Sequence, residues 1–144
     1  MSKPVCLVTG VGPDKGTGAE IARRFANGGY RVALLARDAD RLAHLETDMV
    51  DAKAYPCDVA DLERLCATVA QIKADMGAPA VVIHNAVRAT HGSLLAMDPD
   101  DLERNFRVNV TALLHLGRET IPDMLAAGSG TILVTGNTSS TRGK

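Results

Sequence analysis

The sequence lacks the features that would indicate nucleic acid, a membrane or a metal as its partner. Its 16 basic and 17 acidic residues are interspersed, and the formal net charge of -1 provides no field to attract nucleic acid or an anionic membrane surface. No apolar run approaches the length of a membrane span, and no signal peptide precedes the first strand pattern. The four histidines are scattered, without cysteine or carboxylate at ligand spacing beside them. We therefore expect a small-molecule or protein partner and no nucleic acid, membrane or metal.

Paired cysteines are also missing. Cys6, Cys57 and Cys66 lie in apolar or helical surroundings without any paired spacing, which predicts reduced thiols in a cytoplasmic protein. No linker, repeat or low-complexity tract divides the 144 residues. Because this length suits one domain with a substantial core, we expect residues 1–144 to form a single domain.

A glycine-rich loop is the most informative feature that is present. Gly10–Gly18 lies between an apolar run at 4–9, which predicts a buried strand, and a helical pattern at 19–25. A second apolar run at 31–36 completes a βαβ unit. Bare backbone at such a turn lets amide hydrogens and a helix N-terminus approach a pyrophosphate. The loop therefore predicts dinucleotide binding, and the alternative is a tight turn without a ligand.

Strand and helix patterns alternate along the rest of the chain. The further elements that we expect are strands at 52–57, 80–84 and 131–135 and helices at 38–47, 61–76 and 98–126, the last with Pro122 as a kink near its end. Strands covered by helices on both faces predict an α/β fold, a doubly wound parallel sheet of the Rossmann-like type with strand order 3-2-1-4-5. Ligands then gather at the carboxyl ends of the strands. Residues expected at that edge are Gly10, Arg37, Asp58, Asn85 and the 135–140 segment.

Four motifs in this order resemble the short-chain dehydrogenase/reductase family over essentially the whole chain. They are Thr9-Gly10 with Gly16 and Gly18, similar to the family's glycine loop; Asp58-Val59, similar to its adenine-contacting pair; Asn85-Ala86, similar to its Asn-Ala-Gly motif; and Asn109, similar to the helix asparagine that holds a water in its proton relay. The resemblance implies hydride transfer between a nicotinamide ring and a carbonyl or alcohol carbon. The cofactor site predicted on this basis comprises Gly10, Lys15, Gly16, Thr17, Gly18, Arg37, Asp58, Val59, Asn85 and Ala86.

Some of these residues also have purely structural interpretations. Asp58 is alternatively a turn carboxylate, and Asn85 a strand-end side chain bonded to local backbone. Asn109 has a low helix propensity, so its place inside a helix favours a buried hydrogen-bonding role.

The chain departs from the family pattern at two places near the cofactor. Five residues separate Gly10 from Gly16, where three are typical, and this spacing resembles the divergent branch that includes bacterial enoyl-thioester reductases. Val87 stands where the family has glycine. A β-branched residue there would crowd the nicotinamide side and would be strained if its φ were positive.

The catalytic end departs further. Aligning strand five with the family brings Asn137 to the position of the catalytic serine, with Thr138 next, and either side chain can donate a hydrogen bond to a carbonyl. A polar loop without catalytic role is the alternative. The family's Tyr-x-x-x-Lys pair follows strand five, whereas this sequence ends at Lys144, and Tyr30 and Tyr55 lie elsewhere. We therefore expect the N-terminal portion of an enzyme, truncated after strand five, inactive alone and exposing that strand's edge.

The cofactor preference follows from the end of strand two. Ala36 offers no carboxylate for the 2′-hydroxyl of NAD, whereas Arg37 suits a 2′-phosphate and Lys15 lies where NADP-preferring relatives have a second basic residue. We therefore expect NADP(H) rather than NAD(H). The alternatives are that Asp38 pairs with Arg37 or that Arg37 is only a solvated cation.

Three functions remain open at this point. An NADP(H)-dependent short-chain oxidoreductase leads, followed by a divergent enoyl-thioester reductase and by a nucleotide-sensing protein without catalysis. The resemblance also implies a homo-oligomer paired through the helix at 98–126.

Overall fold

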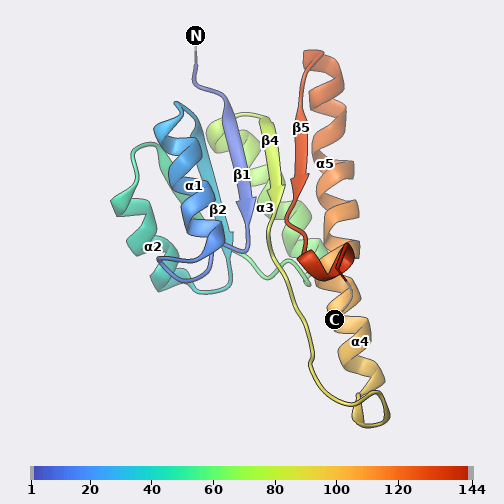
Figure 1. The fold of residues 1–144 in the computed structure, drawn as a ribbon. Coiled ribbons are helices and arrows are strands. Elements are labelled where there is room, and N and C mark those ends of the chain that lie inside the picture. The colour runs from blue at the N-terminus through green and yellow to red at the C-terminus, as the bar shows by residue number, and fades with distance from the viewer. Residues whose placement is uncertain (1, 143–144) are drawn as a thin grey trace.

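Five parallel strands lie between two layers of helices in the computed structural model, which describes residues 2–142 (Figure 1). The strands are β1 (Val5–Thr9), β2 (Arg31–Ala36), β3 (Ala52–Pro56), β4 (Pro79–His84) and β5 (Thr131–Val134). The α-helices are α1 (Thr17–Asn27), α2 (Ala39–Asp48), α3 (Leu62–Met76), α4 (Pro99–Phe106) and α5 (Ala112–Ala127). The order β3-β2-β1-β4-β5 confirms the predicted doubly wound sheet.

Alternate residues of the central strands supply two separate cores. Val5 and Leu7 of β1 pack into a cluster with α3 and α5, whereas Cys6 and Val8 pack with α1 and α2 on the other face. Figure 1 shows these two helix layers on opposite sides of the sheet. Every residue of β1 is buried, as expected for the centre of a parallel sheet.

Aspartate caps fix the starts of three helices. The side chains of Asp38, Asp61 and Asp98 accept hydrogen bonds from backbone amides in the first turns of α2, α3 and α4, which satisfies donors that a helix start leaves free. Gly77 ends α3 with a φ of 100°. The predicted elements therefore exist, with ends displaced by one or two residues.

The helix expected at 98–126 is corrected by the structure. It consists of α4, a π-helical segment at Arg107–Thr111, and α5, which runs past Pro122 to Ala127. We call Arg107–Thr111 the π segment. Such segments inside α-helices are rare and are frequent at functional sites, and this one contains Asn109.

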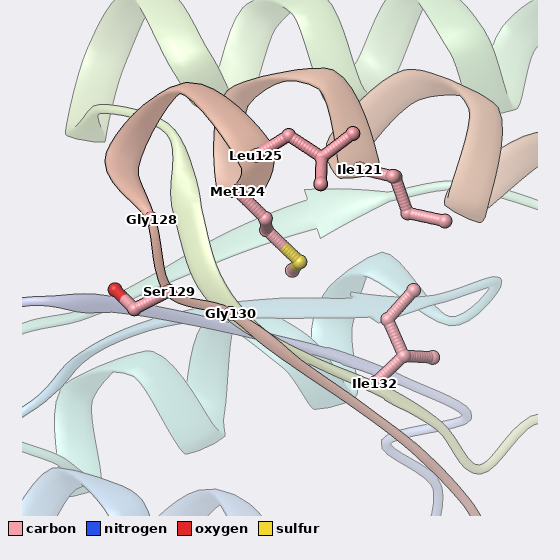
Figure 2. A pocket seen from close by; sticks show the side chains of 7 residues that line it. All are labelled: Ile121, Met124, Leu125, Gly128, Ser129, Gly130 and Ile132. Carbon is pink, nitrogen blue, oxygen red and sulfur yellow. The ribbon is translucent and has the colours of Figure 1, made fainter.

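The fifth strand is open to solvent, as expected. Leu133 and Val134 are 46% and 53% exposed. A hollow of about 390 Å³ lies where α5 ends and β5 begins, and Figure 2 shows Ile121, Met124, Leu125 and Ile132 around it. Because it lies at the start of β5, it is away from the carboxyl edge of the sheet. No helix among residues 2–142 is long and apolar enough to cross a membrane.

Candidate functional site

The glycine loop packs directly against the end of β4. Gly10 has a φ of +69°, and a Cβ added there would lie 2.5 Å from the Cα of Ala86. A Cβ on Gly18 would lie 2.4 Å from the carbonyl oxygen of Gly10 and 2.8 Å from Nδ2 of Asn85. The sequence-predicted residues Gly10, Gly18, Asn85 and Ala86 are thus brought together where β1 and β4 lead into connections on opposite faces of the sheet.

Helix α1 begins inside this loop without a side-chain cap. Gly16 is its N-cap residue, Thr17 is exposed and Gly18 is buried. The first amides of a helix have no acceptor within the helix, and together with the helix dipole they favour an anion. Backbone amides at this end of α1 are therefore suited to a diphosphate.

Arg23 fastens the outer part of the loop. Its Nη1 donates to the backbone oxygen of Asp14 at 2.6 Å, and its guanidinium also pairs with the carboxylates of Asp14 and Glu20. The hydrogen bond to Asp14 is the main cause of a raised pKa at Arg23. The sequence did not predict the contact between Arg23 and Asp14, because these residues lie nine positions apart and Asp14 belongs to a loop without regular periodicity.

The two cations predicted to select NADP(H) lie at the surface. Arg37 is exposed directly after β2, and within residues 2–142 it forms no ion pair. Asp38 does not pair with it, since Asp38 caps α2 and lies 3.7 Å from Nη2 of Arg41. Lys15 is exposed and, with Thr17, lines a hollow of about 470 Å³ beside Phe25 of α1.

Asp58 and Val59 follow β3 and have different surroundings. Oδ1 of Asp58 accepts a hydrogen bond from the amide of Ala60 at 2.9 Å while the side chain stays exposed. Asp58 therefore acts as a turn carboxylate, one of the two interpretations of this residue from the sequence, and its side chain is still accessible from the surface. Val59 is 6% exposed and belongs to the core on the α3 side.

Asn85 and Ala86 are held by the buried Thr9. The Thr9 hydroxyl oxygen accepts hydrogen bonds from the amides of Asn85 and Ala86, both at 3.1 Å, and lies 3.0 Å from Nδ1 of His84. Nδ2 of Asn85 donates to the carbonyl of Gly10 at 3.0 Å. Nε2 of His84 reaches the carbonyl of Val108 at 2.9 Å. Thr9 and His84 were not predicted as site residues, although a polar residue ending a buried apolar run was a usable signal.

The side chain of Asn109 joins the π segment to the loop after β4. Its Oδ1 accepts from the amide of Arg88 at 2.9 Å, and its Nδ2 donates to the carbonyl of Arg88 at 2.8 Å. Asn109 therefore has the hydrogen-bonding role predicted for it, although its side chain is only partly buried. The guanidinium of Arg88 continues to Asp101 of α4 at 2.7 Å.

The backbone strain considered for Val87 does not occur. Its side chain is 78% exposed, and among the described non-glycine residues only Asp51 has a positive φ. Valine therefore fits this position without backbone strain.

Asn137 and Thr138 lie in a short 3-10 turn after β5. Asn137 caps the turn, and its Oδ1 accepts from the amide and the hydroxyl of Ser139 at 2.9 and 3.0 Å. No hydrogen bond within residues 2–142 joins either residue to Asn109. Within residues 2–142, these three predicted catalytic residues are therefore not linked to one another across the π segment and the turn by hydrogen bonds.

Neither tyrosine lies in the candidate site. The phenol of Tyr55 donates to Asp75 at 3.1 Å, and burial followed by this hydrogen bond raises its pKa. Tyr30 packs edge-on against Phe25 at a centroid distance of 5.0 Å.

Comparison with known families decides which fold family this geometry represents. The sequence pattern described as short chain dehydrogenase matches residues 4–144. The chain belongs to the short-chain dehydrogenase family.

Relatives within the short-chain dehydrogenase family are oxidoreductases and ketoacyl reductases by name. A putative ketoacyl reductase of the granaticin polyketide synthase of Streptomyces violaceoruber is 34% identical, with 99% of this chain and 53% of the relative covered. An uncharacterized oxidoreductase of Mycobacterium bovis is 31% identical, with 83% and 37% covered.

Two solved structures of the family were obtained with a cofactor. An actinorhodin polyketide ketoreductase variant with NADPH superposes with a TM-score of 0.91 at 27% identity, covering 100% of this chain and 58% of the other. A metagenomic short-chain oxidoreductase with NADP gives a TM-score of 0.86 at 32% identity, covering 93% and 62%. The chain thus spans about half the length of the relatives that it matches.

Proposed function

We propose that this chain forms the NADP(H)-binding part of a short-chain oxidoreductase that transfers hydride between nicotinamide and a carbonyl or alcohol carbon. The observation on which this depends is the uncapped start of α1 beside Gly10, at the point where β1 and β4 send their connections to opposite faces. In open α/β sheets, ligands bind at such a switch point.

The preference for NADP(H) is supported by charge. Arg37 is exposed without an ionic partner in the described chain, and Lys15 is exposed in the glycine loop. Each charge-assisted hydrogen bond to a 2′-phosphate contributes about 1.5–3 kcal/mol, enough to change preference roughly tenfold or more. The structures solved with NADP and NADPH add support from relatives.

The reaction class is supported by the names of relatives. These include a putative ketoacyl reductase and an acetoacetyl-CoA reductase of Paracoccus denitrificans, the latter 30% identical over 78% of this chain. Reduction of a ketone group is the chemistry common to both names. In this proposal Asn137 and Thr138 would supply hydrogen bonds to a substrate carbonyl.

We further propose that residues 1–144 alone bind cofactor without appreciable turnover. Neither Tyr30 nor Tyr55 is placed to transfer a proton at the carboxyl edge, and a positioned acid or base contributes about 10²–10⁴-fold. A nucleotide-binding protein without chemistry makes the same prediction for this chain. Turnover measured in a longer chain that contains residues 1–144 would separate these two functions.

Cofactor titration tests the proposal. NADPH and NADH are titrated by calorimetry into the native chain, the Arg37→Asp variant and the control Arg118→Asp, which makes the same charge change on α5. The native chain and the control should prefer NADPH, whereas Arg37→Asp should shift preference toward NADH by about tenfold or more. Unchanged relative affinities in Arg37→Asp would contradict the NADP(H) assignment, and no binding of either dinucleotide would contradict the function itself.

Two accompanying proposals concern assembly and location. Exposed apolar residues on α4 and α5 support a homo-oligomer paired through 98–126. A cytoplasmic location is supported by the three cysteines, none of which forms a disulfide in the described chain.

A further inference from the structure

One buried imidazole connects three elements at the candidate site. His84 is 2% exposed, and both ring nitrogens have a partner: the carbonyl of Val108 for Nε2 and the hydroxyl of Thr9 for Nδ1. These partners come from the π segment and from β1, whereas His84 ends β4. The imidazole therefore joins the two central strands to the irregular part of the long helix.

The partners determine which nitrogen holds the proton. A carbonyl oxygen only accepts, so Nε2 of His84 must donate to Val108 and Nδ1 must accept from the Thr9 hydroxyl. Because that hydroxyl gives its proton to His84, its lone pairs are available for the amides of Asn85 and Ala86. Every group in this network is satisfied with the neutral Nε2–H tautomer. A proton on Nδ1 would leave the Thr9 hydroxyl hydrogen without its acceptor.

The network continues to the loop that follows β4. Val108 adjoins Asn109 in the π segment, and Asn109 holds both main-chain groups of Arg88. Movement of the π segment would therefore displace the loop. Loss of the Thr9 contacts would remove the hydrogen bond of the Asn85 amide and disturb the packing against Gly10. If His84 only filled space in the core, its ring nitrogens would have no part in either effect.

We propose that His84 is a positioning residue for nucleotide binding, and that its Nε2–H tautomer couples the π segment to the ends of β1 and β4. The Asn85–Arg88 backbone is thereby held in the shape that accepts the dinucleotide. This inference rests on the proposed function for its ligand, but the coupling itself belongs to the free chain.

The experiment compares two variants that each mimic one ring nitrogen. The side-chain amide introduced by His84→Asn would lie near the position of Nδ1 and cannot reach Val108, whereas the longer amide introduced by His84→Gln extends to the position of Nε2. His84→Asn, which loses the bond to Val108, should weaken NADPH binding about tenfold. His84→Gln keeps that bond and loses only the acceptor of the Thr9 hydroxyl, so it should weaken binding by about threefold. Hydrogen exchange at the Arg88 amide should accelerate in His84→Asn and stay near native in His84→Gln.

A stability control separates positioning from general loosening. Val69 of α3 is fully buried, so Val69→Ala removes methyl groups from the core and should lower stability. It should leave NADPH affinity and Arg88 exchange unchanged. In the native chain, imidazole ¹⁵N shifts at pH 7 should identify the Nε2–H tautomer, a result that requires no variant to fold.

Three results would overturn the inference. The first is an Nδ1–H or cationic imidazole at pH 7. The second is a His84→Asn variant with native NADPH affinity and native Arg88 exchange. The third is a Val69→Ala variant that loses as much NADPH affinity and Arg88 protection as His84→Asn. If the native chain fails to bind NADPH, the proposed function fails, while the tautomer and exchange measurements still decide whether His84 couples these elements.

Discussion

Gly10 and Gly12 belong to one loop but have different surroundings. A Cβ on Gly10 would lie 2.5 Å from Ala86 backbone atoms at a positive φ, whereas one on Gly12 would meet only the Gly10 carbonyl at 3.9 Å. Gly10→Ala should therefore cost more than about 1 kcal/mol of unfolding free energy and weaken NADPH binding. Gly12→Ala should stay within about 0.5 kcal/mol of native. Urea unfolding measures both, and similar losses for the two variants would contradict the packing described.

The buried His84 also gives a pH-dependent contribution to stability. Burial lowers its pKa in the folded chain, so below a pH of about 6.5 the unfolded chain binds a proton that the folded chain does not. Stability should therefore fall as the pH decreases from about 6.5 toward the folded pKa, by at most about 1.4 kcal/mol per pH unit. The unfolding free energy of the native chain minus that of His84→Gln should decrease between pH 7.5 and 5.5. A difference that stays constant or increases on acidification would exclude this contribution.

Individual residues differ in how well sequence predicts them. The close backbone approaches at Gly10 and Gly18 were predictable, because glycines between a strand and a helix commonly mark places where a Cβ has no room. Asn85 and Asn109 were found by motif, but their bonding to Gly10 and Arg88 depends on contacts between distant segments. Thr9 was named with the glycine-loop motif, but its hydrogen bonds to Asn85 and Ala86 join strands far apart in the sequence.

Among the elements, the π segment makes the sharpest prediction. Asn109→Ala removes two part-buried hydrogen bonds to Arg88, which at about 0.5–1.5 kcal/mol each contribute about 1–3 kcal/mol together. We expect a destabilisation in this range and faster exchange of the Arg88 amide. Asn109→Asp preserves the acceptor for that amide but loses the donor to the carbonyl, so its exchange should lie between native and Asn109→Ala.

The order of exchange rates provides the check. Rates measured by NMR should increase from native through Asn109→Asp to Asn109→Ala, while an amide in the middle of α3 keeps its native rate in all three. Native Arg88 exchange in Asn109→Ala would show that the side chain does not hold this loop.

The π segment was beyond sequence reasoning for a physical reason. Apolar spacing averaged over the stretch 98–126 fits an ordinary helix, and one inserted residue per turn over Arg107–Thr111 barely changes that average. Its only local signal was a poor helix former, Asn109. The aspartate caps at 38, 61 and 98 were predictable because the acceptor and the amide it satisfies lie within three residues.

Across the whole molecule, apolar side chains remain exposed along α4 and α5. Leu102, Phe106, Leu114 and Leu125 are each at least 59% exposed, which is typical of an interaction surface. If the chain pairs through this surface, Leu114→Glu should convert a dimer into a monomer. Val50→Glu is the matched control, since Val50 is 77% exposed in the turn after α2.

Light scattering coupled to size-exclusion chromatography measures the masses. The native chain and Val50→Glu should have twice the monomer mass at micromolar concentration, and Leu114→Glu the monomer mass. A native monomer, or a dimer that survives Leu114→Glu, would contradict pairing through α4 and α5.

The architecture of the sheet was predictable because few topologies are compatible with alternating strands and helices. Right-handed crossovers restrict the strand order, and apolar runs at β1 and β4 are buried on both faces. The placement of Asn137 and Thr138 was less predictable, since a polar segment after an exposed strand has no packing pattern to orient it.

Amide NMR during an NADPH titration follows dinucleotide binding at the glycine loop residue by residue. We expect saturable shifts of the amides of Gly12 and of residues 14–18, together with Arg37 and Asn85, while amides around the hollow at 121–132 keep their positions. Saturation without shifts in the glycine loop, or no saturation at all, would show that this loop does not bind the dinucleotide.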